Sequence, residues 1–140
     1  MKLPDVNLLV YAFRHDAASH QISRVWLNST VAGDARFAVS KLALAAFVRI
    51  VTNRRIHPNP TSLADAFAFC DNLLSQPHCE VIEPRERHWD IFCRLCLETN
   101  TRADDTTDAW YAALAIEWGC EWVTCDRDFL KFPGLSCTVL

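Results

Sequence analysis

The sequence predicts an α/β domain in which helices cover both faces of a mostly parallel sheet. Short apolar runs typical of strands alternate with longer segments of helical periodicity. Strands separated by helices need crossover connections, and these favour parallel pairing. The chain has 140 residues, of which 51% are hydrophobic and 22% are charged. This composition suits one globular domain over residues 1–140 with its own core.

The expected strands are short apolar segments that lie between helical patterns. The segment at 121–125 follows Gly119, a residue that commonly ends helices. The first segment carries Asp5 at its end, before the next helical pattern begins. In chain order the expected strands are 2–6, 37–39, 79–83, 121–125 and 136–140.

The expected helices have apolar residues repeated every three or four positions. Asn7 is the expected cap of the first helix, and Thr61 stands before the fourth. The sequence "HPNP" at 57–60 separates the third helix from the fourth. Leu63, Phe67 and Cys70 are expected on the inner face of the fourth helix. The expected ranges are 7–14, 19–30, 41–53, 62–75, 86–98 and 107–118.

Charge and cysteine content limit the possible classes of function. The net charge of −3 excludes a generally basic nucleic-acid-binding protein, so any contact with phosphates must be local. Seven scattered cysteines predict free thiols and a cytoplasmic protein. Cys93 and Cys96 form a CxxC within an expected helix, but zinc would need two more ligands, and His88 is the only close candidate. No signal peptide is recognised, and no apolar run reaches the ~20 residues of a membrane helix.

Four aspartates are predicted to meet at one edge of the sheet. Asp5 follows the first strand, and Asp126 and Asp128 follow the strand at 121–125. Asp108 opens the preceding helix, which is expected to run antiparallel to that strand. Because the carboxyl ends of parallel strands share one edge, the four side chains should converge there. Taken singly, each aspartate also suits a cap, a turn or a helix N-terminus.

Converging carboxylates repel one another unless protons or cations compensate their charge. Oxygen ligands favour the hard cations Mg²⁺ and Mn²⁺, and Mg²⁺ often completes its shell with water and substrate phosphate. This arrangement is typical of a metal-dependent nuclease. We therefore expect Asp5, Asp108 and Asp126 to bind metal and Asp128 to bind or support it. The alternative for Asp128 is to cap a short helix at 129–132.

Three segments of the chain carry a family resemblance: "LPDVNLLVYAF", "FVRIVTNRR" and "TDAWYAALAIEWGCEWVTCDRDFLKFPGL". They resemble PIN-domain ribonucleases, in particular the VapC-type toxins of toxin–antitoxin pairs. The resemblance implies a three-layer α/β/α sandwich, Mg²⁺- or Mn²⁺-dependent RNA cleavage, a homodimer and inhibition by a cognate antitoxin. It implies catalytic roles for Asp5, Asp108, Asp126 and Asp128, and supporting roles for Asn7 and Thr124.

One position departs from the pattern of this family. The family commonly carries a glutamate in the helix after the second strand, where this chain has Ala46. The change removes a metal-binding or water-orienting carboxylate, so it bears on metal affinity and rate. Asp104 and Asp105, before the late helix, are candidate substitutes. The alternative function is therefore a PIN-like module that binds RNA or an antitoxin without cutting.

The densest basic run is "RIVTNRRIH" at 49–57. An acidic protein needs a local positive strip to contact RNA phosphates, so Arg49, Arg54 and Arg55 are candidate contacts. The same run also suits a solvated helix C-terminus.

The apolar helices at 41–52 and 7–13 suit either the core or a surface shared by the homodimer and the antitoxin. An aspartyl-phosphate phosphatase is disfavoured, because such enzymes need Asp-x-Asp after the first strand and this chain has Asp5-Val6-Asn7.

Overall fold

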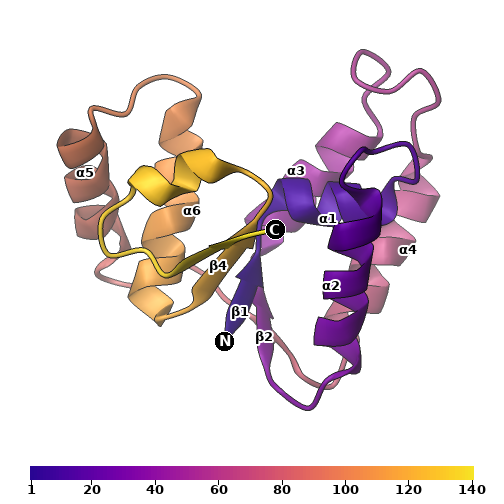
Figure 1. Cartoon of the computed structure of the whole chain (residues 1–140), viewed down its shortest axis with the longest axis horizontal. Coiled ribbons are helices and arrows are strands. Elements are labelled where there is room, and N and C mark those ends of the chain that lie inside the picture. The colour runs from indigo at the N-terminus through magenta and orange to yellow at the C-terminus, as the bar shows by residue number, and fades with distance from the viewer.

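One parallel sheet of five strands lies at the centre of the computed structural model, which describes residues 1–140 (Figure 1). The strands are β1 (Lys2–Pro4), β2 (Phe37–Val39), β3 (Cys79–Val81), β4 (Glu121–Thr124) and β5 (Cys137–Val139). Their order is β3-β2-β1-β4-β5, and every pairing is parallel. Each strand lies within the segment that the sequence predicts, so the expected sheet is confirmed.

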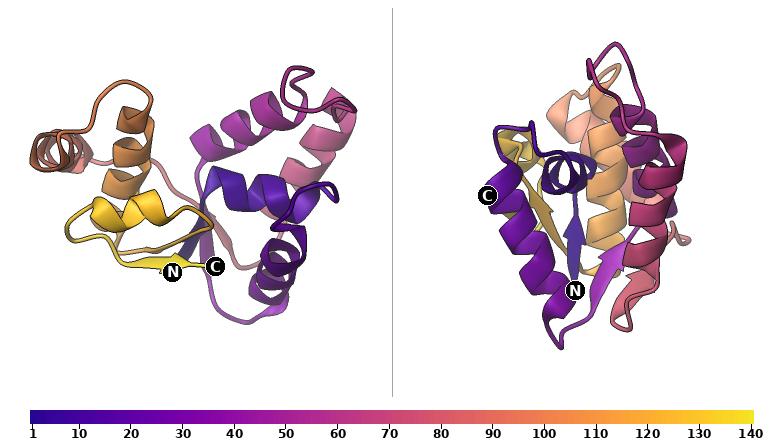
Figure 2. Two further views of the ribbon diagram at one scale, coloured as in Figure 1. Left: turned by 45° about the horizontal axis from the view of Figure 1, so that its top comes forward. Right: turned by 90° about the vertical axis from the view of Figure 1, so that its right-hand side faces the viewer.

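Helices cover both faces of this sheet and make it the middle layer of three. They are α1 (Val6–Phe13), α2 (His20–Ala32), α3 (Lys41–Val51), α4 (Leu63–Leu74), α5 (His88–Thr99), α6 (Asp105–Trp118) and the 3₁₀ helix η1 (Arg127–Lys131). Figure 2 shows α2 on one face of the strands, with α4 and α6 on the other. The predicted α/β/α sandwich is thus confirmed.

The strand order reverses at β1, which lies between β2 and β4. Pro4 is paired with Val123, and the backbone N–H of Asp5 donates to the Val123 carbonyl at 2.8 Å. Asp5 therefore leaves the sheet beside Thr124, the last residue of β4. In open α/β sheets, ligand sites form where the strand order reverses, outside the carboxyl ends of the strands.

Trp122 anchors β4 in the core. Its buried ring stacks on Tyr111 of α6, with ring centroids 5.7 Å apart, and lies 5.0 Å from the ring of Phe129 in η1. Aromatic pairs of this kind contribute beyond the burial of their area. Helix α6 and η1 are thereby fixed on the strand that leads into the acidic segment.

The caps of two helices differ from the prediction. Asn7 is not the cap of α1, because Asp5 stands at the N-cap position. Ser62 rather than Thr61 caps α4, and its hydroxyl accepts a backbone hydrogen bond from the first turn. The cap of α1 thus lies two residues earlier than expected, and the cap of α4 lies one residue later. Neither difference changes the fold.

The buried face of α4 also differs. Cys70 lies in the core as expected, but Leu63 and Phe67 are 58% and 52% exposed. Ala66 and Leu73 take the buried positions instead. Helix α4 carries apolar residues around more than one stripe, so periodicity alone did not fix which stripe packs inward.

All seven cysteines are free thiols, as predicted. His88, the candidate ligand nearest to Cys93 and Cys96, is buried, and its ring N–H donates to the Trp110 carbonyl at 3.0 Å. The structure contains no helix with the length and apolar character required to cross a bilayer.

Gly119 ends α6 in the left-handed region, at φ 65°. Gly119→Ala should lower the free energy of unfolding by about 1–2 kcal/mol, because a Cβ disfavours this conformation. Gly119→Asn should cost less, since asparagine tolerates the left-handed region. Urea unfolding of both variants measures this, and a Gly119→Ala variant as stable as the wild type would contradict the assigned helix end.

Candidate active site

Asp5 is the buried member of the acidic cluster. It stands between β1 and α1 and is only 3% exposed. The hydroxyl of Thr124 donates to its Oδ2 at 2.6 Å. Together with the backbone bond to Val123, this contact fixes the carboxylate against the end of β4. Thr124 is thus in direct contact with the Asp5 carboxylate.

The segment after β4 continues the same series of hydrogen bonds. The N–H of Asp126 donates to the Thr124 hydroxyl oxygen at 2.9 Å, and the N–H of Asp128 donates to Oδ1 of Asp126 at 2.8 Å. Asp126 is thus the cap of η1. The alternative that Asp128 caps a helix at 129–132 is wrong, because η1 begins earlier and Asp128 lies within it.

Burial raises the pKa of Asp5 to about 6. The Thr124 hydroxyl and the backbone amides of Asn7 and Val6 oppose this rise, and the charge of Asp108 adds to it. Asn7 acts here through its backbone, at the N-terminus of α1, where the helix dipole also favours a carboxylate.

Asp108 lies in the first turn of α6 and is half-buried. Burial and then the charge of Asp126 raise its pKa to about 6, with smaller contributions from Asp105 and Asp128. Lys131 opposes the rise. Asp108 is thus coupled electrostatically to Asp5 on one side and to Asp126 and Asp128 on the other.

Two tyrosines border the acids, and sequence reasoning did not identify them. Burial and the charge of Asp5 raise the pKa of Tyr111 to about 12, and Arg49 opposes this. Tyr11 has a raised pKa through burial, Cys125, Asp5 and Asp126. The spacing of Asp108 and Tyr111, three residues apart on one helix, was the available signal for the first.

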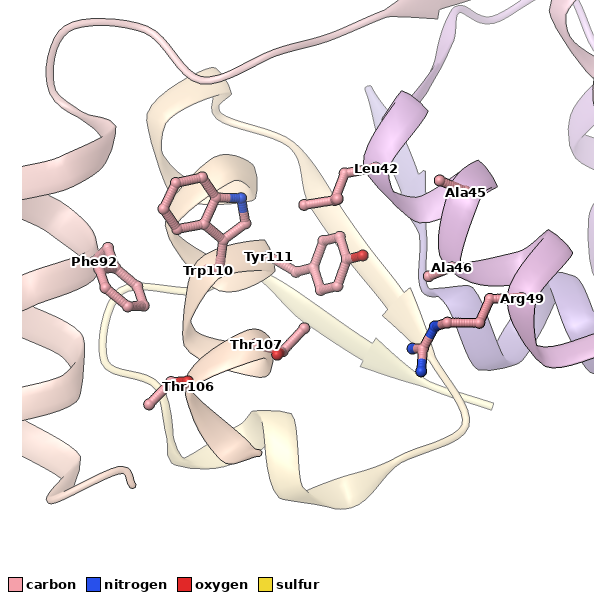
Figure 3. A pocket seen from close by; sticks show the side chains of 9 residues that line it. All are labelled: Leu42, Ala45, Ala46, Arg49, Phe92, Thr106, Thr107, Trp110 and Tyr111. Atoms are coloured by element: carbon pink, nitrogen blue, oxygen red, sulfur yellow. The ribbon is translucent and has the colours of Figure 1, made fainter. Parts of the chain in front are cut away.

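The predicted basic residues divide into two groups. Arg49 reaches into the space between α3 and α6 together with Tyr111 (Figure 3). Arg54 and Arg55 are exposed in the turn after α3, which leads away from α6 (Figure 1). Of these three arginines, only Arg49 therefore lies next to Tyr111.

The candidate substitutes for the missing glutamate also differ from each other. Asp105 is near Asp108 and forms an ion pair with Lys131, with 3.8 Å between Nζ and Oδ2. Asp104 is exposed at the N-cap position of α6. Ala46 itself faces α6 from the same side of α3 as Arg49 (Figure 3).

The donor set fits a hard divalent cation in its chemistry. As placed, no three side chains of His, Cys, Asp or Glu are close enough to enclose an ion. The groups at the site are nevertheless carboxylates, and Asp5 and Asp108 hold protons more tightly than isolated aspartates do. A cation would relieve the burial and mutual repulsion that cause those raised pKa values.

The chain belongs to the PIN domain family, which its residues 2–135 match. Within that family it groups with the VapC ribonucleases. It is 41% identical to ribonuclease VapC25 of Mycobacterium tuberculosis over 135 residues, which cover 96% of this chain and 95% of the relative. Ribonuclease VapC31 of the same species is 39% identical over the same shares.

Solved structures support the fold. VapBC2 of Rickettsia felis, bound to a DNA fragment from its promoter, aligns with a TM-score of 0.70 at 18% identity over 99% of this chain and 97% of the other. VapC20 of M. tuberculosis, described as a toxin that cleaves the Sarcin-Ricin loop, aligns with a TM-score of 0.68 at 14% identity over 96% and 98%.

Asp5 should make the metal-free protein less stable as the pH rises from about 4 to 6. In this window the folded protein keeps a proton that the unfolded chain releases, because the folded pKa is raised from 3.8 to about 6. Between pH 4.5 and 7, the free energy of unfolding should fall by about 2 kcal/mol more in the wild type than in Asp5→Asn. Urea unfolding with a chelator present, at both pH values, measures the difference.

Asp16→Asn is the matched control for this experiment. Arg14 holds the pKa of Asp16 below its usual value, so this variant should lose stability at neutral pH instead of gaining it. Identical pH profiles for wild type and Asp5→Asn would show that Asp5 carries no raised pKa.

Proposed function

We propose that this chain is a metal-dependent endoribonuclease and the toxin of a VapBC-type toxin–antitoxin pair. The observation that carries the proposal is the buried Asp5, coupled electrostatically to Asp108, whose charge is coupled in turn to Asp126. Burying a carboxylate beside others is unfavourable unless a cation compensates it. Membership among the VapC ribonucleases supports RNA as the substrate.

In this proposal Asp5, Asp108 and Asp126 hold Mg²⁺ or Mn²⁺, with Asp128 as a ligand or a support. The cation would supply Lewis-acid chemistry: activation of water and stabilisation of the departing oxygen of the phosphodiester. Thr124 orients Asp5, and Asp126 orients the backbone of Asp128. Asp5 and Asp108, which retain protons near pH 6, would release them in order to hold the cation.

Arg49 is the basic group best placed to meet the substrate. Its charge lies near enough to Tyr111 to lower the pKa of that hydroxyl. A guanidinium here can contact a phosphate next to the one that is cut. Arg54 and Arg55 lie in the exposed turn after α3, so they would contact the RNA strand farther from the cleaved phosphate.

The alternative is a PIN module that binds RNA or an antitoxin without cutting. Ala46 favours it, because the stripe of α3 that faces α6 carries no acid: it consists of Leu42, Ala45, Ala46 and Arg49. The three remaining metal-binding candidates make a complete site the stronger interpretation, since Mg²⁺ needs only a few protein ligands.

The proposed partners are a cognate antitoxin and a second copy of the chain. Similar folds occur in VapBC complexes from R. felis and Salmonella typhimurium. Helix α1 is almost wholly buried and belongs to the core, whereas α3 exposes Leu42. The stripe of α3 that contains Leu42, rather than α1, therefore remains available for partners. Because the proposed substrate is cellular RNA, the proposed place of action is the cytoplasm.

Asp5→Asn should lower RNA cleavage in Mg²⁺ or Mn²⁺ by at least about 100-fold, because it weakens the cation site. Chelation should abolish wild-type activity, and added Mn²⁺ should restore it. Asp90→Asn, an exposed position on α5, is the control and should retain wild-type rates. Equal cleavage by wild type and Asp5→Asn would reject the assignment of the site.

Ala46→Glu separates the two functions. If the aspartates already form a working site, the added carboxylate should change kcat by less than about tenfold. Activity that rises from near zero, with a large gain in metal affinity, would instead support the non-cutting module. Single-turnover cleavage and Mn²⁺ titration of wild type and variant give both quantities, with Ala46→Gln as the uncharged control.

A further inference from the structure

A cavity of about 450 Å³ lies between α3 on one side and α6, with Phe92 of α5, on the other (Figure 3). One wall is the α3 stripe that contains Ala45 and Ala46, whose small side chains leave the space open. The other wall is formed by α6, with Trp110 and Tyr111. None of the four aspartates lines the cavity, and Arg49 is the only charged residue that does.

The cavity and the acidic cluster share helix α6, because Thr107 and Tyr111 line the cavity and Asp108 lies between them in the sequence of that helix. Tyr111 lines the cavity, and its hydroxyl is within the electrostatic range of Asp5 and Asp108. Arg49 lines it as well and acts on the same hydroxyl. A substrate held at Asp108 would therefore lie next to the cavity.

An aromatic strip leads from the protein surface into this cavity. Trp89 on α5 is 62% exposed, and its ring lies 5.5 Å from that of Phe92. Phe92 lies 5.4 Å from Trp110 and lines the cavity with it. So large an exposed indole, next to the partly buried rings of Phe92 and Trp110, indicates a surface that binds a partner or ligand.

We propose that the cavity and the strip of Trp89, Phe92 and Trp110 bind unpaired bases of the RNA next to the scissile phosphate. This inference rests on the proposed ribonuclease function. Single-stranded RNA is gripped by stacking of its bases on aromatic rings, with cationic groups along its backbone. The strip offers the rings, and Arg49 offers the cation at the point nearest the acids.

The polar groups in the cavity fit the same occupant. The hydroxyl of Thr107 stands on the α6 wall and can bond to the edge of a base, whereas the Thr106 hydroxyl donates to the Ala103 carbonyl at 2.7 Å and has only its oxygen left to accept. The single positive charge suits a polyanion, and the acids that would repel phosphates lie outside the cavity. A base would fill the space that Ala45 and Ala46 leave.

Binding of a 5′-labelled single-stranded RNA by the Asp5→Asn protein tests this inference without cleavage. Trp89→Ala in that background should weaken binding about tenfold, as expected for the loss of one stacked base. Ala45→Phe, which fills the cavity, should weaken binding comparably. Leu97→Ala is the matched control, because Leu97 is 83% exposed on the same helix and lines no part of the cavity. It should bind like the parent protein.

The outcomes separate this inference from the proposed function. Unchanged RNA affinity of Trp89→Ala, or no RNA binding by the Asp5→Asn protein, overturns the base-binding strip. A Trp89→Ala protein that changes from dimer to monomer on size exclusion without weaker RNA binding also overturns it, in favour of a contact between copies. Trp89-dependent binding by a wild type that cuts no RNA supports the strip and rejects the nuclease.

Discussion

The structure depends on one buried carboxylate at the point where the strand order of the sheet reverses. Asp5 leaves β1 between two neighbouring strands and is held by the backbone of Val123 and the hydroxyl of Thr124. Removing its charge from water is unfavourable, as its raised pKa records. The fold tolerates this cost because α1 begins there and because a cation can compensate the charge.

The arrangement of the other groups follows from that position. The core contacts of Trp122 fix α6 and η1 on β4, and this places Asp108 and Asp126 beside Asp5. Positive charge enters at two points, Lys131 and Arg49, although the whole chain is acidic. Acids and apolar rings thus occupy adjacent but separate zones, one suited to a cation and the other to bases.

The sequence predicted the converging aspartates because the rule about strand ends needs only the order of the elements. It did not identify Tyr111, whose role depends on how α6 is turned, nor the cap made by Asp126, which depends on the local turn. Periodicity predicts Leu63 and Phe67 on the inner face of α4, but both are exposed, because a helix with several apolar stripes can bury any one of them. Helix rotation and loop geometry are set by tertiary packing, which one sequence leaves open.

Calorimetric titration with Mn²⁺ at pH 6, in buffers of different ionisation enthalpy, tests whether the buried carboxylate builds a cation site. We expect saturable binding with release of about one proton per ion, because Asp5 and Asp108 are each about half protonated at this pH. The release should disappear at pH 8 and be reduced in Asp5→Asn. Binding without proton release, or equal binding by wild type and Asp5→Asn, would contradict a cation site built on the buried carboxylate.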